Sequence, residues 1–254
     1  MGISRLRPVA DTTVSDWLVE GVGSFGTDVG SLLPQGFESY VRLLHPAVSV
    51  EEGPIQWATV AEWSGGTMHS KVQFAELART RSGFGLGPAP WEEPPPAGEL
   101  PTELLSYLCE VLAGYTTTRR RCLFCLWDGY GWIYGSPSVA KVGSLATIPP
   151  AFPPEVIDGP RVKLPGRDYI LFQGPLDAAQ DLGWHLSDDE FIPQSPNVFW
   201  PEDHAWCVTT DIDLDSTYIG GSAELARDLL VDARLEVVPV NPTDPISSSS
   251  DDAN

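Results

Sequence analysis

The chain has 254 residues, of which 42% are hydrophobic and 20% are charged, and this is enough apolar material for one large core or two small ones. Collagen-like, coiled-coil and fully disordered chains are excluded by this composition. The chain has 35 acidic residues against 15 Lys and Arg, a formal net charge of -20. Proteins that bind nucleic acids present the opposite charge to phosphates, so we expect no nucleic-acid partner.

The negative charge is concentrated in the last third of the chain. Residues 168–254 contain 18 acidic residues and only two bases, Arg227 and Arg234. No run of 18 apolar residues occurs, and the first residues lack the apolar region of a signal peptide, so we expect a cytoplasmic protein without a membrane partner. Only three Lys and three Asn occur, a bias that suggests a high-GC bacterial genome.

In the first half of the chain the sequence predicts short helices and one strand. A helix is expected near residues 14–19, a strand over 37–45, and two short helices over 55–63 and 71–79. Residues 85–101 are rich in proline, which removes hydrogen-bond donors and fixes φ, so they cannot sustain a helix or a strand ladder. They are either a linker between two domains or a long excursion from a single one.

The second half opens with the most regular helical pattern, residues 102–112, where leucines recur at helical spacing behind Thr102 as the expected N-cap. Residues 122–127 and 132–134 predict a β-hairpin, since Asp128-Gly129 between them is typical of tight hairpin turns. The remaining elements are expected as follows: strands over 167–173, 205–211 and 235–240, and a capped helix over 222–231.

The order of these elements predicts an α+β fold with a mixed, largely antiparallel sheet, flanking helices and Pro-rich excursions. We expect a single domain over residues 1–240, with the division near residues 85–101 left open. Residues 241–254 are rich in Ser and Asp and have nothing to bury, so we expect a disordered tail.

Cys122 and Cys125 have the spacing of a metal or redox pair, and Cys109 and Cys207 could complete a four-ligand set. In a strand, however, side chains at i and i+3 point to opposite faces, and the intervening Leu-Phe is typical of a core. We expect four buried structural thiols.

Asp211, Asp213 and Asp215 alternate along what reads as an extended segment. Period-2 spacing would place the three carboxylates on one edge, where they could hold a hard cation such as Mg²⁺. The alternative is a strand exit with solvated aspartates that leads into a turn and a helix N-cap.

The chain has nine tryptophans, too many for all of them to be fully buried in a domain of this size. We expect some to line an exposed aromatic groove or interface. The candidate binding residues in these loops are Trp127, Asp128, Tyr130, Trp132 and Trp200.

Three stretches resemble those of an uncharacterised group of actinobacterial soluble proteins with no assigned activity: residues 36–46 (GFESYVRLLHP), 126–131 (LWDGYG) and 211–218 (DIDLDSTY). The resemblance runs over most of residues 30–240. It implies no activity, cofactor or catalytic residue.

The sequence contains no specific catalytic motif, and two hypotheses of different class follow. The first is a cytoplasmic binding or regulatory module that needs no cofactor and acts by protein–protein interaction, with a partner whose surface is basic. The alternative is a metal-assisted hydrolase or phosphotransferase that uses Asp211, Asp213 and Asp215 with Mg²⁺. A DNA-mimicking protein fits less well, because 20% charged residues is below the average of about 25%.

Overall fold

The computed structural model describes residues 5–24, 26, 28–85, 87–141, 144–187, 190–247, 250–251 and 253–254. In this part of the chain a nine-stranded antiparallel sheet forms the centre. Its strands lie in the order β1 (Arg7–Pro8), β9 (Arg167–Gly174), β5 (Cys122–Trp127), β12 (Val198–Pro201), β13 (Cys207–Thr209), β14 (Ser216–Gly221), β2 (Ser39–Leu44) and β15 (Val237–Val240), with β8 (Val162–Leu164) paired to β9.

Three further antiparallel strand pairs lie outside this sheet: β3 (Ala47–Ser49) with β4 (Gly53–Ile55), β6 (Ser136–Lys141) with β7 (Ser144–Ile148), and β10 (Gly183–Ser187) with β11 (Glu190–Pro193). The α-helices are α1 (Asp16–Gly21), α2 (Trp57–Ser64), α3 (Phe74–Leu77), α4 (Thr102–Leu112), α5 (Pro154–Ile157) and α6 (Ala223–Val231).

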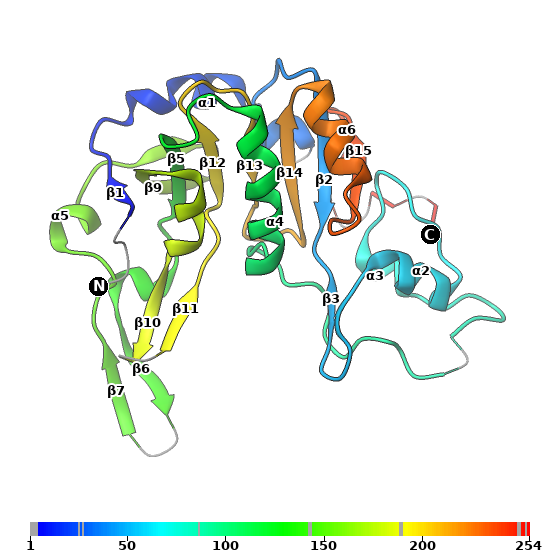
Figure 1. The fold of residues 1–254 in the computed structure, drawn as a ribbon. Helices are drawn as coiled ribbons and strands as arrows, with labels where there is room; N and C mark the ends of the chain where they lie inside the picture. The colour runs from blue at the N-terminus through cyan, green and yellow to red at the C-terminus, as the bar shows by residue number, and fades with distance from the viewer. Residues whose placement is uncertain are drawn as a thin grey trace.

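Each face of the sheet is covered by a different set of elements. Helices α4 and α6 and the 3-10 segment Leu176–Asp181 pack on one face and form the larger core with it. Helix α1 and the 3-10 turn Val29–Ser31 pack on the other face around a second core. Figure 1 shows α4 running along the middle of the sheet, with α6 beside it.

The two cores arise from the alternation of side chains along the strands. In β5, Cys122, Phe124 and Leu126 face the α4 side, whereas Leu123 and Cys125 face the α1 side, as the period of two requires. All five side chains are buried, because β5 lies in the interior of the sheet between β9 and β12.

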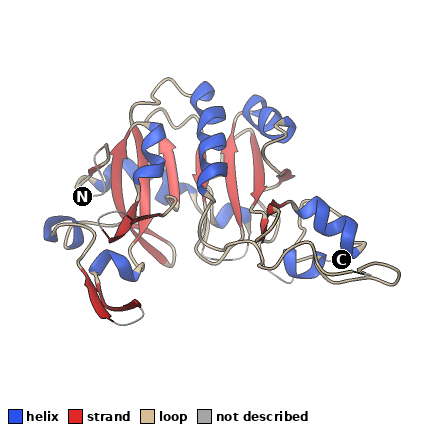
Figure 2. Ribbon diagram, turned by 60° about the horizontal axis from the view of Figure 1, so that its bottom comes forward, coloured by secondary structure: helices blue, strands red, loops and turns tan. Residues whose placement is uncertain are grey.

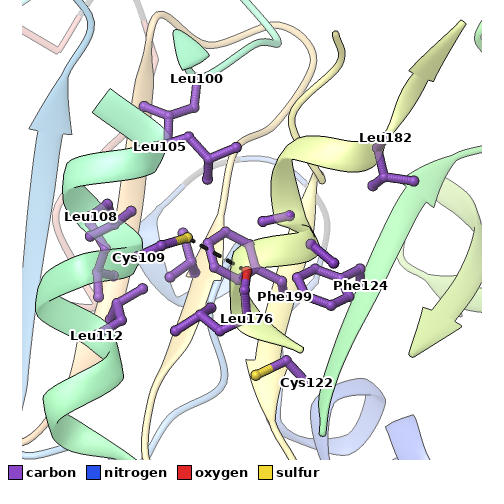
Figure 3. Close-up of a cluster of buried hydrophobic side chains, with 14 of the residues drawn as sticks. Leu100, Leu105, Leu108, Cys109, Leu112, Cys122, Phe124, Leu176, Leu182 and Phe199 are labelled. Atoms are coloured by element: carbon purple, nitrogen blue, oxygen red, sulfur yellow. Dashed lines mark hydrogen bonds between the residues drawn. The ribbon is translucent and has the colours of Figure 1, made fainter. Parts of the chain in front are cut away.

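Helix α4 closes the larger core through its leucines. Leu105, Leu108 and Leu112 are buried and lie in the same cluster as Phe124 and Phe199 of the sheet (Figure 3). The two phenylalanine rings stack with centroids 6.0 Å apart. Burial of these large side chains supplies the main stabilisation of this layer.

A smaller unit of α2, α3 and the β3–β4 pair lies beside the β15 side of the sheet (Figure 2). It has its own cluster of buried residues around Trp57 and Val60. The carboxylate of Glu236, which directly precedes β15, accepts hydrogen bonds from the backbone N–H groups of Trp57 (2.6 Å) and Ala58 (2.7 Å). It thereby caps the N-terminus of α2 and ties this unit to the sheet.

The described residues of the Pro-rich stretch, 85 and 87–101, contact both this unit and the main sheet. Val48 of β3 exchanges backbone hydrogen bonds with Glu93, and Leu100 is buried in the larger core. The amide of Gly98 donates to the carbonyl of Leu214 (2.9 Å). Gly98 has φ of +77°, and a Cβ there would come within 2.7 Å of the Ile212 carbonyl oxygen, so the close approach requires glycine.

The predicted α+β fold with a largely antiparallel sheet is confirmed. The elements with clear local patterns are where the sequence places them, namely β2, α4, β9 and α6. The N-cap of α6 is Ser222, whose hydroxyl accepts from the Leu225 amide, as predicted. Helix α4 differs at its start, because Thr102 is its first helical residue and Pro101 is its N-cap.

The predicted hairpin over residues 122–134 is wrong. Residues after Asp128 form a 3-10 helix, Gly131–Tyr134, and β5 pairs instead with β9 and β12. A Cβ at Gly129 would come within 2.1 Å of the Trp127 ring. Glycine is therefore needed at this position for the close packing of Trp127, and Asp-Gly does not form a two-residue turn.

All four cysteines are free and buried, as expected from the sequence. Cys122 and Cys125 face opposite sides of β5. Burial raises the pKa of Cys109 and of Cys122 to about 12, so these thiols stay protonated and unreactive at neutral pH.

Candidate functional site

A cleft of about 440 Å³ opens on the α1 side of the sheet, at the end where β13 leaves it. Its floor is formed by Tyr169 of β9, Val198 of β12 and Thr209 of β13, with β5 lying between β9 and β12 in the sheet. The acidic turn over residues 211–215 lines one side. The other walls are lined by Leu32, Gln73, Pro95, Ala97, Leu164, Pro165, Ile246 and Ser247. Segments distant in sequence thus meet around a single hollow.

The acidic residues form a compact turn, and the predicted extended ladder is wrong. β13 ends at Thr209 and β14 begins at Ser216. Between them the amide of Leu214 donates to the carbonyl of Asp211 (3.1 Å), and the amide of Asp213 donates to the Asp211 carboxylate (3.0 Å). An aspartate that accepts from the backbone two residues later is typical of a turn.

Two arginines hold this turn from outside it. Arg167 of β9 donates to Asp211 (3.4 Å) and to Asp213 (2.6 Å). Arg42 of β2, only 3% exposed, lies 3.5 Å from Asp215. These ion pairs explain how three carboxylates can occupy five residues of chain without strong mutual repulsion.

The three carboxylates do not converge as a metal centre. Arg167 occupies the space between Asp211 and Asp213, and Asp215 is drawn toward Arg42. No group of three or more His, Cys, Asp or Glu side chains suited to a metal ion occurs in the described ranges.

Several polar atoms of the cleft residues have no hydrogen bond to a described residue. They include the Tyr169 hydroxyl and the Oδ2 atoms of Asp211 and Asp215, whose Oδ1 atoms make all the contacts of those carboxylates. Tyr169 is 4% exposed, and its hydroxyl is not among the fully buried polar atoms without a partner, so this oxygen is open to the cleft. Burial raises the pKa of Tyr169, and the Asp211 charge adds to this rise, so the hydroxyl stays protonated.

Three of the predicted aromatic residues are connected to the cleft through Arg167. The Trp127 ring is 5.9 Å from the Arg167 guanidinium carbon, and Tyr130 packs edge-on against Trp127 with centroids 5.2 Å apart. Trp132 stacks on Tyr130 at 5.9 Å. The three rings are half-buried, and they pack against the two cores, Trp127 on one and Tyr130 and Trp132 on the other.

Asn197 locks this arrangement to the sheet. Its side-chain amide donates to the Tyr130 hydroxyl (3.0 Å), and its carbonyl accepts from the Trp127 amide (2.8 Å). The Tyr130 hydroxyl in turn donates to the Gly98 carbonyl (3.2 Å). The loop after β5, the Pro-rich stretch and β12 are therefore connected through one tyrosine.

Two of the predicted binding residues have structural roles. Asp128 pairs with Arg161 (3.0 Å) and accepts from the Tyr134 hydroxyl (2.5 Å), which fixes the loop after β5. Trp200 is fully buried in the second core and packs against Trp17 at 5.9 Å. The prediction that Trp200 lies in an exposed loop is wrong, because β12 is an interior strand with a partner on each side.

Ile246 and Ser247, within the stretch 241–254 for which the sequence predicts a disordered tail, line one side of the cleft. Ile246 is 7% exposed and lines the cleft beside Ser247. The carboxylate of Asp251 accepts from His69 Nε2 (2.9 Å) and from the Gln73 amide (3.0 Å). Asp251 therefore holds this segment against the residues that directly precede α3.

A larger hollow of about 860 Å³ lies beside α4, but two of its polar side chains, Arg5 and Cys109, are not available to bind or react with a ligand. Its Arg5 is paired with Asp177 and Asp181, each at 2.7 Å. Cys109, which also lines it, is a protonated thiol at neutral pH because its pKa is about 12. We therefore take the cleft over Tyr169 as the candidate site.

Sequence reasoning found the acidic turn and the neighbouring aromatics but missed Arg42, Arg167 and Tyr169. Each lies within a strand whose pattern indicates only sheet structure, and none stands in a recognisable motif. Their roles depend on pairing between segments 44 to 173 residues apart, which local patterns do not report.

Comparisons with protein-family models, with curated proteins and with solved structures found no match for this chain. Within the described residues, no helix has the length and apolar character needed to cross a membrane.

Proposed function

We propose that this protein is a cytoplasmic binding module whose cleft receives a basic segment of a partner protein. One observation carries the proposal: the cleft combines an acidic turn with the hydroxyl of Tyr169, a residue that is only 4% exposed, and this hydroxyl is open to the cleft and has no partner among the described residues. A bound ligand would supply that partner.

The charge balance of the cleft favours a cationic ligand. Asp211, Asp213 and Asp215 line it together with one cation, Arg167. Arg167 already contacts two of these carboxylates. An anionic ligand would have to displace these ion pairs, whereas a cationic one would complete the coordination of the remaining carboxylate oxygens.

The charge of the whole chain supports the same class of partner. A net charge of -20 repels polyanions and attracts basic surfaces over a distance of about 10 Å at moderate ionic strength. The apolar part of the lining, including Val198, Leu214 and Ile246, matches the aliphatic stems of basic side chains.

The proposal is tested by photo-crosslinking in the native host. A photoreactive amino acid replaces Leu164, which lines the cleft, and in a matched control it replaces Val50, which is 84% exposed on the β3–β4 turn. We expect a specific adduct from position 164 only, and its cross-linked peptide should be rich in Lys and Arg.

The same adduct should be lost when Asp211→Asn and Asp215→Asn are combined. An equal adduct from position 50, a cross-linked peptide without basic residues, or no adduct from position 164 would each contradict a basic-segment site.

A further inference from the structure

The acidic turn already binds guanidinium groups from two sides, and this indicates what it would hold on the third. Arg167 uses the Oδ1 atom of Asp211 and the Oδ2 atom of Asp213. Arg42 approaches the Oδ1 atom of Asp215. Both contacts leave the Oδ2 atoms of Asp211 and Asp215 without a partner in the described part of the chain.

We propose that the cleft is a pocket for one arginine side chain of the partner, with its guanidinium group held by Asp211, Asp215 and the Tyr169 hydroxyl. This inference rests on the proposed function and adds the identity of the bound group. The observation that carries it is that Asp211, Asp215 and Tyr169 line the same cleft. Each of them has an oxygen atom that could accept a hydrogen bond and has no partner among the described residues.

Arginine fits this acceptor set better than lysine does. Its guanidinium presents five N–H donors in a rigid plane, so it can serve several separated acceptors at once, whereas a lysine ammonium is a compact point charge. The acceptors here come from two ends of a turn and from a separate segment of the chain, strand β9. A carboxylate that receives a charge-assisted hydrogen bond gains more than it would from a neutral donor.

The lining also offers apolar surface to the methylene groups of an arginine side chain. Apolar side chains from four segments, Leu32, Leu164, Val198 and Ile246, line the cleft around the polar groups. A side chain entering it would bury its methylene groups on these residues while its charged end meets the acidic turn.

The test is an NMR titration of the full chain with three acetylated, amidated peptides, Gly-Arg-Gly, Gly-Lys-Gly and Gly-citrulline-Gly. Citrulline has the shape of arginine but no charge. We expect saturable shifts at the amides of residues 209–215 with the arginine peptide, weaker binding of the lysine peptide, and at least about tenfold weaker binding of the citrulline peptide.

Two variants locate the site. Asp215→Asn should weaken binding of the arginine peptide about tenfold. Asp168→Asn removes the same charge from the position next to Tyr169, where the side chain is 49% exposed and paired with Lys163, and it should leave binding unchanged.

A third variant keeps the test independent of folding. Tyr169→Phe removes only a hydroxyl without a described partner, so the melting temperature should not fall, while binding of the arginine peptide should weaken several-fold. Equal binding of the citrulline and arginine peptides, or unchanged binding by Tyr169→Phe, would overturn the arginine pocket.

The two proposals fail in different ways. A specific adduct from position 164 with a basic peptide, together with equal binding of the arginine and citrulline peptides, would leave the binding module standing and remove the arginine pocket. Saturable arginine binding without any adduct from position 164 would instead contradict a protein partner.

Discussion

Buried polar residues of this protein are held in fixed protonation states by their neighbours. His45 is fully buried, with Nδ1 2.9 Å from the Pro96 carbonyl and Nε2 2.9 Å from the Thr217 hydroxyl. Because a carbonyl only accepts, Nδ1 carries the proton and Nε2 accepts from Thr217. Burial lowers the pKa of His45 to about 4, and nearby Arg42 acts in the same direction, against the Pro96 carbonyl and Asp215.

The low pKa of His45 predicts a specific acid sensitivity. The unfolded chain binds a proton at this residue below pH 6.5, whereas the folded chain does so only near pH 4. The contribution of His45 to the free energy of unfolding is therefore fully present above pH 6.5. It is lost as the pH falls from 6.5 to 4, by about 3 kcal/mol in total. Urea unfolding between pH 7 and pH 4.5 measures this loss.

The matched comparison uses two variants. His45→Gln should unfold with a pH slope smaller than that of the wild type by up to one proton, whereas His185→Gln at an exposed histidine should keep the wild-type slope. Burial also raises the pKa values of Glu99 and Glu236. Both residues are present in all three proteins, so their contributions cancel when the pH slopes are compared. Identical slopes for wild type and His45→Gln would show that His45 is not the sensitive group.

Trp200 is predicted to contribute to stability and not directly to binding. It is fully buried, so Trp200→Ala should lower the free energy of unfolding by about 3–5 kcal/mol. Its indole N–H has no partner among the described residues, so Trp200→Phe should cost clearly less. Chemical denaturation checks both, with the half-exposed Trp132→Ala as control; a loss for Trp200→Ala no larger than for the control would contradict this assignment.

At the residue scale, the sequence identifies the types of group at the site but not their contacts. Asp211 to Asp215 and Trp127 to Tyr130 stand out because they are unusual in composition. Whether the carboxylates hold a metal or meet arginines depends on Arg167 and Arg42, which come from other strands. Trp200 reads as a loop residue because Asn197 and Pro201 flank it, yet these residues only bound a short interior strand.

At the scale of elements, local sequence patterns are sufficient to predict helices, because the backbone hydrogen bonds of a helix lie within one segment. Helices α4 and α6 follow from apolar spacing and, for α6, from the Ser222 cap. Strand pairing is different, because β5 could pair locally in a hairpin or with a strand from a distant part of the chain. The structure pairs it with β9, about 45 residues later, and with β12, so that both edges are hydrogen-bonded and its two apolar faces pack into the two cores.

The C-terminal segment is the element whose sequence is least informative. Its serines and aspartates resemble a solvated tail, but Asp251 finds backbone and imidazole donors on the approach to α3. Such contacts depend on a partner surface that composition does not describe.

This docking predicts a local effect of Asp251→Ala. The Gln73 amide donates to the Asp251 carboxylate (3.0 Å), so its hydrogen exchange should accelerate about tenfold or more once this acceptor is removed. The Leu77 amide bonds to the Gln73 carbonyl within the α3 turn and serves as the internal control. Unchanged exchange at Gln73 in the variant would contradict a docked C-terminal segment.

At the scale of the whole molecule, part of the net charge of -20 lies at the cleft. The acidic third of the chain contributes the turn of residues 211–215, which lines the cleft on the sheet face opposite α4 and α6. Its charge is partly balanced by Arg42 and Arg167 from the first two-thirds. We propose that the remaining negative potential of the cleft recognises a basic partner.

The most direct measurement is hydrogen–deuterium exchange of the full chain with and without the partner captured through position 164. We predict slower exchange in residues 162–169 and 209–215, weakened by added salt, with helix α6 unchanged. Protection confined to α4 and α6, or none around the cleft, would contradict the claim that this acidic cleft is the binding site.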